Sequence, residues 1–252
     1  MSEAALEARG VVKRFGQTEA LGPLNLAISL GSFVSVLGPS GCGKSTLLRL
    51  FAGLDSASEG SLWRGGMRLD GPSRDVGIVY QDHVLFPWAS VLENVLLSAR
   101  VYGLAERPAR ERAMHLLRLT GIADFAGHRP SALSGGMKQR AAFCRALLPE
   151  PQMLLLDEPF GALDGLTREE LSLELSRLWD ELGRTAMLIT HDIDEAILLS
   201  DRVVVMSPRP GLIVADIPVE LPRPRGMETA SLPGFAAIRQ QLRALLFARR
   251  AT

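Results

Sequence analysis

The sequence Gly38-Pro39-Ser40-Gly41-Cys42-Gly43-Lys44-Ser45-Thr46 stands between a compact apolar run, 32–37, and a run with helical periodicity, 44–53. It satisfies the pattern G-x-x-x-x-G-K-[ST] in the strand-loop-helix setting that the pattern requires. Glycines let backbone N–H groups turn toward phosphate oxygens, and the helix N-terminus adds its positive dipole end. The segment therefore predicts a site for the phosphates of ATP, where Lys44 neutralises the β and γ phosphates and Ser45 contacts Mg²⁺.

A second apolar run, 153–156, ends on two acidic residues, Asp157 and Glu158. In open parallel sheets ligands bind at the carboxyl ends of the strands, and alternation turns the two side chains in different directions. Asp157 is therefore the candidate Mg²⁺ partner, and Glu158 is the candidate that orients or deprotonates the attacking water. On its own such an ending is often a turn with two solvated acids, so the catalytic interpretation depends on the phosphate loop.

The remaining patterns predict how the chain is organised. Alternating apolar residues at 8–13 and 24–30 predict a small β layer with a turn near 16–19. The segment of about 87–150 predicts a helical insert, with helices at 91–101, 108–120 and 134–148. Beyond it, strands at 153–156, 185–189 and 202–206 alternate with helices at 167–182 and 193–199. This alternation predicts parallel strands with helices on both faces of the sheet.

Composition limits the class of protein. A chain of 252 residues with 47% hydrophobic and 22% charged residues fits one folded domain with an accessory part. No apolar stretch approaches the roughly 18–20 residues needed to cross a bilayer, and residues 1–10 lack a signal-peptide core, which predicts a cytosolic protein. The two cysteines, Cys42 and Cys144, predict reduced thiols and no disulfide framework. The 28 basic and 28 acidic residues create no overall field that would attract nucleic acid.

Another glycine-containing stretch opens the predicted helix 134–148 and reads Leu133-Ser134-Gly135-Gly136-Met137-Lys138-Gln139-Arg140. A serine and two glycines at a helix N-terminus make a second anion site. One chain does not need two phosphate cradles for one nucleotide. Together with the two earlier motifs, this stretch resembles the LSGGQ signature of ATP-binding cassette (ABC) ATPases, with Met at the fifth place. The resemblance implies that Ser134, Gly135 and Gly136 close over the ATP of a second copy, in a head-to-tail dimer.

Four further residues match motifs of that family. Gln81 matches the glutamine that reaches Mg²⁺ and the attacking water, and His191 resembles the switch histidine that contacts the γ-phosphate. Asp164 is similar to the aspartate that contacts the facing subunit. Phe15 fits the aromatic residue that stacks on adenine, although a core phenylalanine fits this position nearly as well. The resemblance covers 5–220 and implies an α/β fold: a P-loop NTPase (RecA-like) core, a small antiparallel β layer and the inserted helical subdomain.

The segment after Gln81 bears on the biological role. Transporter cassettes use it as a socket for a helix of the membrane subunit, and here it carries Phe86 and Trp88, which could dock a partner or equally pack the insert. Only 89 positions separate Ser45 from Ser134. That leaves no room for the long coiled coil of DNA-repair cassettes, and the single cassette differs from the tandem cassettes of translation factors.

Several short stretches look like the ATPase subunits of nitrate, sulfonate and taurine importers: 85–88, 190–196 and the Pro-Arg repeat at 222–225, with Asp82 where a glutamate is usual. The resemblance implies an ATP-hydrolysing importer subunit on the cytoplasmic face of the inner membrane. Its implied partners are two transmembrane permease subunits and a periplasmic or lipid-anchored substrate-binding protein, without nucleic acid. Two alternatives stay open: an importer ATPase for thiamine-precursor pyrimidines, and a soluble cassette that works without a membrane subunit.

The segment 221–252 is basic, with one acidic residue, Glu228, against arginines at 223, 225, 239, 243, 249 and 250. Its Pro-Arg repeat predicts an extended linker. Apolar residues then recur at helical spacing and predict a terminal amphipathic helix: Phe235, Ile238, Leu242, Leu245 and Leu246. We expect the apolar stripe to pack on the same chain and the arginines to face water, with a membrane-surface or regulatory role as the alternative.

Overall fold

Two β-sheets form the framework of the chain in the computed structural model, which describes residues 4–161 and 163–247 apart from the side chains of Leu178 and Leu182. Arg249 and Arg250 lie outside the described residues. The smaller sheet has the order β2-β1-β4-β5 and is antiparallel throughout. Its strands are β1 (Ala4–Phe15), β2 (Thr18–Ser29), β4 (Glu59–Arg64) and β5 (Met67–Arg68). The predicted β layer is therefore present, with longer first strands than the apolar alternation alone indicated.

The larger sheet contains six strands in the order β10-β9-β3-β8-β7-β6. All neighbours are parallel except β10, which runs antiparallel to β9 at the edge. Every residue of β3 (Phe33–Leu37) and β8 (Thr185–Ile189) is buried, as expected for central parallel strands that are covered on both faces. The other strands are β6 (Val76–Val79), β7 (Met153–Asp157), β9 (Arg202–Met206) and β10 (Ile213–Pro218).

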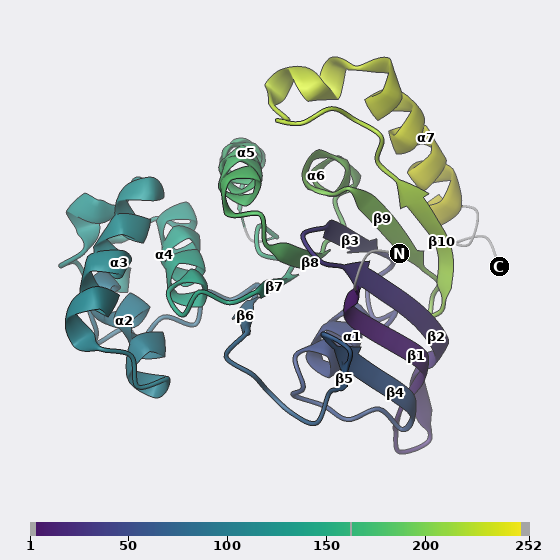
Figure 1. Cartoon of the computed structure of the whole chain (residues 1–252). Helices are drawn as coiled ribbons and strands as arrows, with labels where there is room; N and C mark the ends of the chain where they lie inside the picture. Colours follow the sequence, from purple (N-terminus) through teal and green to yellow (C-terminus); the bar gives the residue numbers. More distant parts are fainter. Residues whose placement is uncertain (1–3, 162, 248–252) are drawn as a thin grey trace.

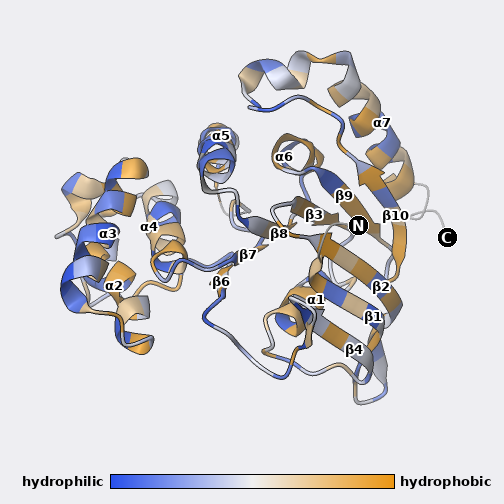
Figure 2. Ribbon diagram, viewed as in Figure 1, coloured by the Kyte–Doolittle hydropathy of each residue, from blue (hydrophilic) through white to orange (hydrophobic). Residues whose placement is uncertain are grey.

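Helices cover both faces of this sheet (Figure 1). Helix α1 (Lys44–Phe51) lies on the face toward the smaller sheet, and α5 (Gly165–Leu182) and α6 (Ile193–Leu199) lie on the other. Leu47, Leu48 and Phe51 of α1 are fully buried in a core shared with both sheets. Figure 2 shows the mainly hydrophobic colouring of α6, whose residues from Glu195 to Leu199 are all buried. The α/β class predicted from the sequence is confirmed.

The helical insert connects the neighbouring strands β6 and β7. It comprises α2 (Val91–Val101), α3 (Glu106–Leu119) and α4 (Gly135–Leu147), with 3₁₀ turns η1 (Ala123–Phe125) and η2 (Pro130–Ala132). Ser90 and Glu93 form a reciprocal capping box that fixes where α2 begins. The three helices share a core with the sheet, in which Val95, Ala113 and Ala141 are fully buried.

The C-terminal segment returns across α5 and α6 (Figure 1). It forms a 3₁₀ turn, η3 (Met227–Ser231), and helix α7 (Pro233–Phe247), and it buries Phe235 and Leu242 against α6 and β9. Among the described residues, no helix combines the length and the apolarity needed to span a bilayer.

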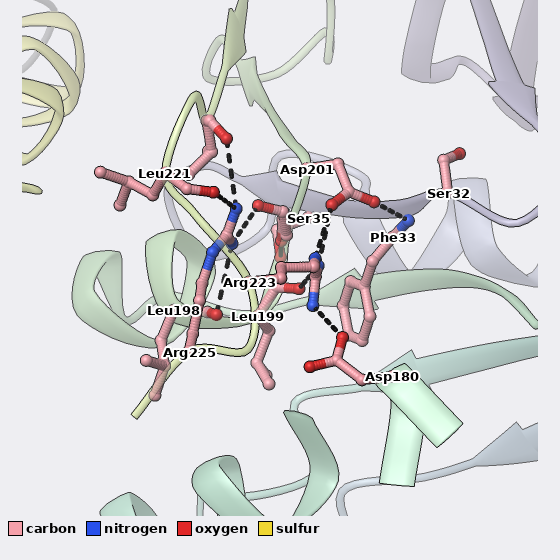
Figure 3. A network of polar contacts seen from close by, with 12 residues as sticks. Ser32, Phe33, Ser35, Asp180, Leu198, Leu199, Asp201, Leu221, Arg223 and Arg225 are labelled. Atoms are coloured by element: carbon pink, nitrogen blue, oxygen red, sulfur yellow. Dashed lines mark hydrogen bonds and ion pairs between the residues drawn. The ribbon is translucent and has the colours of Figure 1, made fainter. Parts of the chain in front are cut away.

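Two arginines of the Pro-Arg repeat attach this segment to the core (Figure 3). Arg223 contacts Asp180 at the end of α5 and Asp201 at the start of β9, each at 2.8 Å. Arg225 is only 3% exposed, and it donates to carbonyls at the end of α6, among them those of Ile197 at 2.9 Å and Ser200 at 2.6 Å. The expectation that the tail arginines face water is therefore wrong for these two, because the last carbonyls of a helix lack intrahelical partners and accept from a cation.

Candidate active site

Three adjacent strands of the larger sheet, β3, β8 and β7, deliver their carboxyl ends to the same edge. The phosphate loop follows β3, His191 follows β8, and Asp157 ends β7 with Glu158 directly after it. Strand order thus brings together motifs that are more than 100 positions apart in the sequence. This edge of the sheet is the candidate active site.

A cavity of about 470 Å³ opens at this edge. The residues that line it are Phe15, Thr18, Ala20, Ser40, Gly41, Gly43, Lys44, Ser45, Thr46, Glu158 and Arg209. Gly43 precedes α1 with φ 105°, and a β-carbon there would lie 2.6 Å from a methyl carbon of Leu21. Only glycine fits this place, so the loop can stay close to β2 with its backbone turned toward the cavity.

The phosphate-loop residues divide between the cavity and the core. Gly38 and Cys42 are buried, and Pro39 is half-buried beside them. The Cys42 side chain packs in the core between the sheets, and burial raises the pKa of its thiol. The Lys44 ammonium donates to the carbonyl of Gly38 at 2.9 Å and to that of Pro39 at 3.1 Å. Cys42 can therefore offer a ligand its backbone only, whereas Lys44 places a buried cation within the loop.

The Ser45 hydroxyl donates to the Asp157 carboxylate at 3.0 Å. Burial raises the pKa of Asp157 above its usual value, and the hydrogen bond from Ser45 opposes that shift. A hydroxyl from the first turn of α1 and a carboxylate from the end of β7 therefore meet at the phosphate loop, and hydroxyl and carboxylate oxygens are ligands that Mg²⁺ prefers.

Glu158 and His191 form the second polar pair of the site. The Glu158 carboxylate lies 3.1 Å from Nδ1 of His191, and Glu158 itself has a left-handed backbone with φ 44°. Its N–H donates to the carbonyl of Ile189 in β8 at 2.8 Å, which holds this unusual turn. A non-glycine residue with positive φ costs free energy and tends to mark a functional position.

Gln81 lies near this pair. A β-carbon added to Gly161 would lie 3.4 Å from Nε2 of Gln81 and 3.6 Å from the Glu158 carboxylate, so both side chains border the same small space. Phe15 lines the cavity at its outer end and is 51% exposed. It is not a core phenylalanine, and its exposed ring can accept a flat apolar group.

The signature residues are placed elsewhere. Ser134 caps α4 by accepting from the N–H of Met137 at 3.3 Å, and Gly136 lies against α5, where a β-carbon would be 3.0 Å from Thr167. None of the three residues Ser134 to Gly136 is among the described residues that line the cavity. Asp164 caps α5 by accepting from Thr167 at 3.1 Å, and this contact lowers the pKa of its carboxyl.

Arg209 is the charged lining residue that the motifs do not predict, beside Thr18 and Ala20. It follows β9 in the turn Ser207-Pro208-Arg209-Pro210-Gly211, and one of its guanidinium nitrogens donates to the carbonyl of Gly41 at 3.1 Å. The signal for it is positional: an arginine just beyond a parallel strand, at the edge of the sheet where ligands bind.

Comparison with known proteins gives consistent results. Residues 21–161 match the family model described as ABC transporter. An ATP-binding protein of Brucella abortus (strain 2308) is 48% identical over 92% of this chain and 89% of its own length. An aliphatic sulfonates import ATP-binding protein of Pseudomonas aeruginosa is 47% identical (92% and 82%), and a taurine import ATP-binding protein of Rhizobium johnstonii is 44% identical (92% and 91%).

Solved structures show the same fold. The dimeric structure of MJ0796, a bacterial ABC transporter cassette, superposes with a TM-score of 0.76 at 33% identity and covers 85% of this chain and 99% of its own. A post-hydrolysis state of the same cassette bound to ADP and Pi gives a TM-score of 0.75 at 34% identity, with the same coverage.

Proposed function

Because this chain belongs to the ABC transporter family, we propose that it is the ATP-hydrolysing subunit of an importer for small anions such as nitrate, sulfonates or taurine. The observation that carries the ATPase part is the convergence of Lys44, Ser45, Asp157 and Glu158 at one edge of the sheet. The importer part is supported by relatives at 44–47% identity that are import ATP-binding proteins.

In this proposal Glu158 orients and deprotonates the attacking water. Its carboxylate lines the cavity and accepts a hydrogen bond from His191 when that nitrogen carries the proton. His191 is itself 55% exposed at its side chain and is placed to reach a terminal phosphate. Gln81, next to the same space, contributes an amide that can hold the water in position.

Ser45 and Asp157 are the residues that would hold Mg²⁺, with Gln81 as a further oxygen ligand. The two oxygens already lie 3.0 Å apart beside the loop, and their chemistry fits a small hard cation. When bound, Mg²⁺ would neutralise charge on the β and γ phosphates. Lys44 adds the protein's own cation within the loop, and Phe15 supplies a ring for adenine.

We further propose that the working unit is a head-to-tail dimer. Ser134, Gly135 and Gly136 present a helix N-terminus away from the cavity of their own chain, so they are free to contact a nucleotide held by a second copy. Asp164 lies at the start of α5, two residues before Leu166. The side chain of Leu166 is 77% exposed, so this end of α5 is accessible to a second copy. The dimeric structure of a 33% identical cassette supports this arrangement.

A groove between the core and the helical insert is our proposed contact with the permease subunits. It has a volume of about 250 Å³, and its walls include Ile78 and Tyr80 on one side and Leu97, Val101 and Tyr102 on the other. Val101 is 71% exposed, an uncommon position for an apolar side chain unless a partner covers it.

The loop that follows Gln81 presents a second apolar surface on the insert. Phe86 and Trp88 stack with ring centres 4.9 Å apart, and Trp88 is 70% exposed. Asn94, fully buried in α2, accepts from the N–H of Phe86 at 2.7 Å and donates to its carbonyl at 3.1 Å. Phe86 is half-buried and its backbone is held to α2, whereas the exposed Trp88 is available for docking.

The last part of the proposal is the identity of the transported compound. We assign a small anion of the sulfonate or taurine type from the two importer relatives, with a substrate-binding protein outside the membrane and this subunit at its cytoplasmic face. Thiamine-precursor pyrimidines are the competing substrate class, and a soluble cassette without a permease is the competing function.

Reconstitution into vesicles tests the proposed substrate class, the competing substrate class and the competing function. The chain is co-expressed with its neighbouring genes, the complex that it forms is placed in phospholipid vesicles, and phosphate release is measured with taurine, an alkanesulfonate, nitrate or a hydroxymethylpyrimidine. We expect one of the first three compounds to stimulate hydrolysis in the complete complex. Stimulation by the pyrimidine alone overturns the substrate, and hydrolysis without any association with the permease overturns the importer.

A further inference from the structure

We infer that Arg209 binds the phosphate chain of ATP and acts as a second cation beside Lys44; this inference rests on the proposed ATPase function. The residue lines the candidate nucleotide cavity, yet it belongs to none of the motifs that define the site. Among the described lining residues the cations are Lys44 and Arg209, and the anion is Glu158. A nucleotide carries several negative charges into a cavity that the motif residues supply with only one cation.

The turn that carries Arg209 is tied down on both sides. Ser207 and Leu212 are bonded to each other across the turn. The N–H of Ser207 donates to the carbonyl of Leu212 at 2.9 Å, and the Ser207 hydroxyl accepts from the N–H of Leu212 at 3.0 Å. Gly211 donates to the carbonyl of Ala20 in β2 at 3.1 Å, and its own carbonyl accepts from Gly22 at 3.2 Å. The backbone that carries the guanidinium is therefore held in place beside the cavity.

Close packing keeps this turn beside the phosphate loop. A β-carbon on Gly211 would lie 2.1 Å from the carbonyl oxygen of Cys42, so the two backbones touch there. The Arg209 side chain continues along the loop to the carbonyl of Gly41. This contact places the guanidinium at the phosphate end of the cavity, on the loop itself, and indicates the phosphates as its target in preference to the base.

The chemistry of the side chain fits that target. Arg209 is exposed and has no carboxylate partner among the described residues, whereas nearby Arg14 is paired with Glu19 at 3.1 Å and also with Glu59. A guanidinium presents a planar fork of donors that matches two phosphate oxygens at once. Its single contact with a neutral carbonyl leaves the other donors available to a ligand.

The test compares nucleotides that differ only in phosphate number. ATP, ADP and AMP are titrated against the full chain by competition with a fluorescent ATP analogue, for the wild type, Arg209→Gln, Arg209→Lys and the matched control Arg14→Gln. We expect Arg209→Gln to weaken ATP binding on the order of tenfold, ADP less and AMP hardly at all, with Arg209→Lys between it and the wild type. Arg14→Gln should bind like the wild type.

The outcomes separate the possible roles. Equal affinities of the wild type and Arg209→Gln for all three nucleotides overturn the inference. An equal loss for ATP, ADP and AMP also overturns it, because it indicates a contact with the nucleoside or a structural tie to Gly41. The thermal unfolding temperature is measured for the same proteins. If it decreases in both Arg209 variants, the contact with Gly41 is a structural tie. A wild type that binds no ATP at all refutes the ATPase proposal instead, since that result does not depend on Arg209.

Discussion

Replacing Arg225 with methionine should loosen the C-terminal segment and destabilise the whole chain. In the wild type the guanidinium donates to Ile197 and Ser200 at the end of α6, and to Val219 before the Pro-Arg repeat at 3.2 Å. Methionine is similar in length and has no donors, so these three carbonyls would lose their partner in a region with little access to water.

The size of the effect follows from those contacts. The three shortest of the five hydrogen bonds of Arg225 contribute about 1 kcal/mol net each, so their removal should lower the free energy of unfolding by about 3 kcal/mol. For a chain of this size, 1 kcal/mol corresponds to about 2–4 °C, which gives a decrease of about 6–12 °C in the unfolding temperature. Burial lowers the pKa of Arg225 to about 10, so a measurement at pH 7 examines the charged form.

Differential scanning calorimetry at pH 7 measures the difference, with Arg243→Met as the control. Arg243 lies on α7 with its side chain exposed, so the same substitution there removes a charge without removing those contacts. Hydrogen exchange of the α6 amides provides a local readout, and we expect faster exchange in Arg225→Met. If both variants unfold at the same temperature, Arg225 does not attach the segment and the reasoning is wrong.

Two further substitutions test the site and its support. Glu158→Gln should abolish steady-state phosphate release while ATP binding and an ATP-dependent dimer persist, because the amide cannot take the proton from water; undiminished release would remove Glu158 from catalysis. Burial raises the pKa of Glu195 to about 8 from 4.5. The folded state therefore keeps a proton that the unfolded state loses above pH 4.5. Stability should decrease as the pH rises from about 4.5 to about 8. Urea unfolding across this range should show the decrease in the wild type and a weaker one in Glu195→Gln, and equal slopes would contradict the assignment.

Much of the fold follows from local patterns. The strands at 185–189 and 202–206 and the helices at 91–101 and 193–199 have the bounds that periodicity predicts, because each is bordered by a clear turn or cap. Strands β4, β5 and β10 were missed: apart from Leu62 of β4, their residues are only half-buried or exposed. Strand β4 is placed by pairing with β1, which lies far away in the sequence, whereas β5 and β10 pair with the strands just before them, β4 and β9.

The residues of the site can likewise be divided into those that the sequence predicts and those that it does not. Motif spacing predicts which residues gather at the edge of the sheet, and the structure places Lys44, Ser45, Asp157, Glu158 and His191 there together. No motif contains Arg209; its one sequence signal is its place just beyond a parallel strand, and its approach to the phosphate loop depends on a turn packed against β2. The sequence does not indicate that Arg225 is buried, since an arginine beside prolines is typical of an exposed linker and its acceptors lie at the end of α6 and at Val219.

The insert between β6 and β7 leaves the sheet and rejoins it on neighbouring strands, whose residues Val79 and Leu156 are paired. Because the two strands are parallel, the insert leaves β6 after Val79 and enters β7 at Met153, which pairs with Val76, so the pairing alone fixes its two ends about 11 Å apart. The helices α2 to α4 could thus be exchanged as a unit, by natural recombination or by design, if the replacement keeps the core that they share with the sheet. Gly136 must also stay small where α4 meets Thr167 of α5.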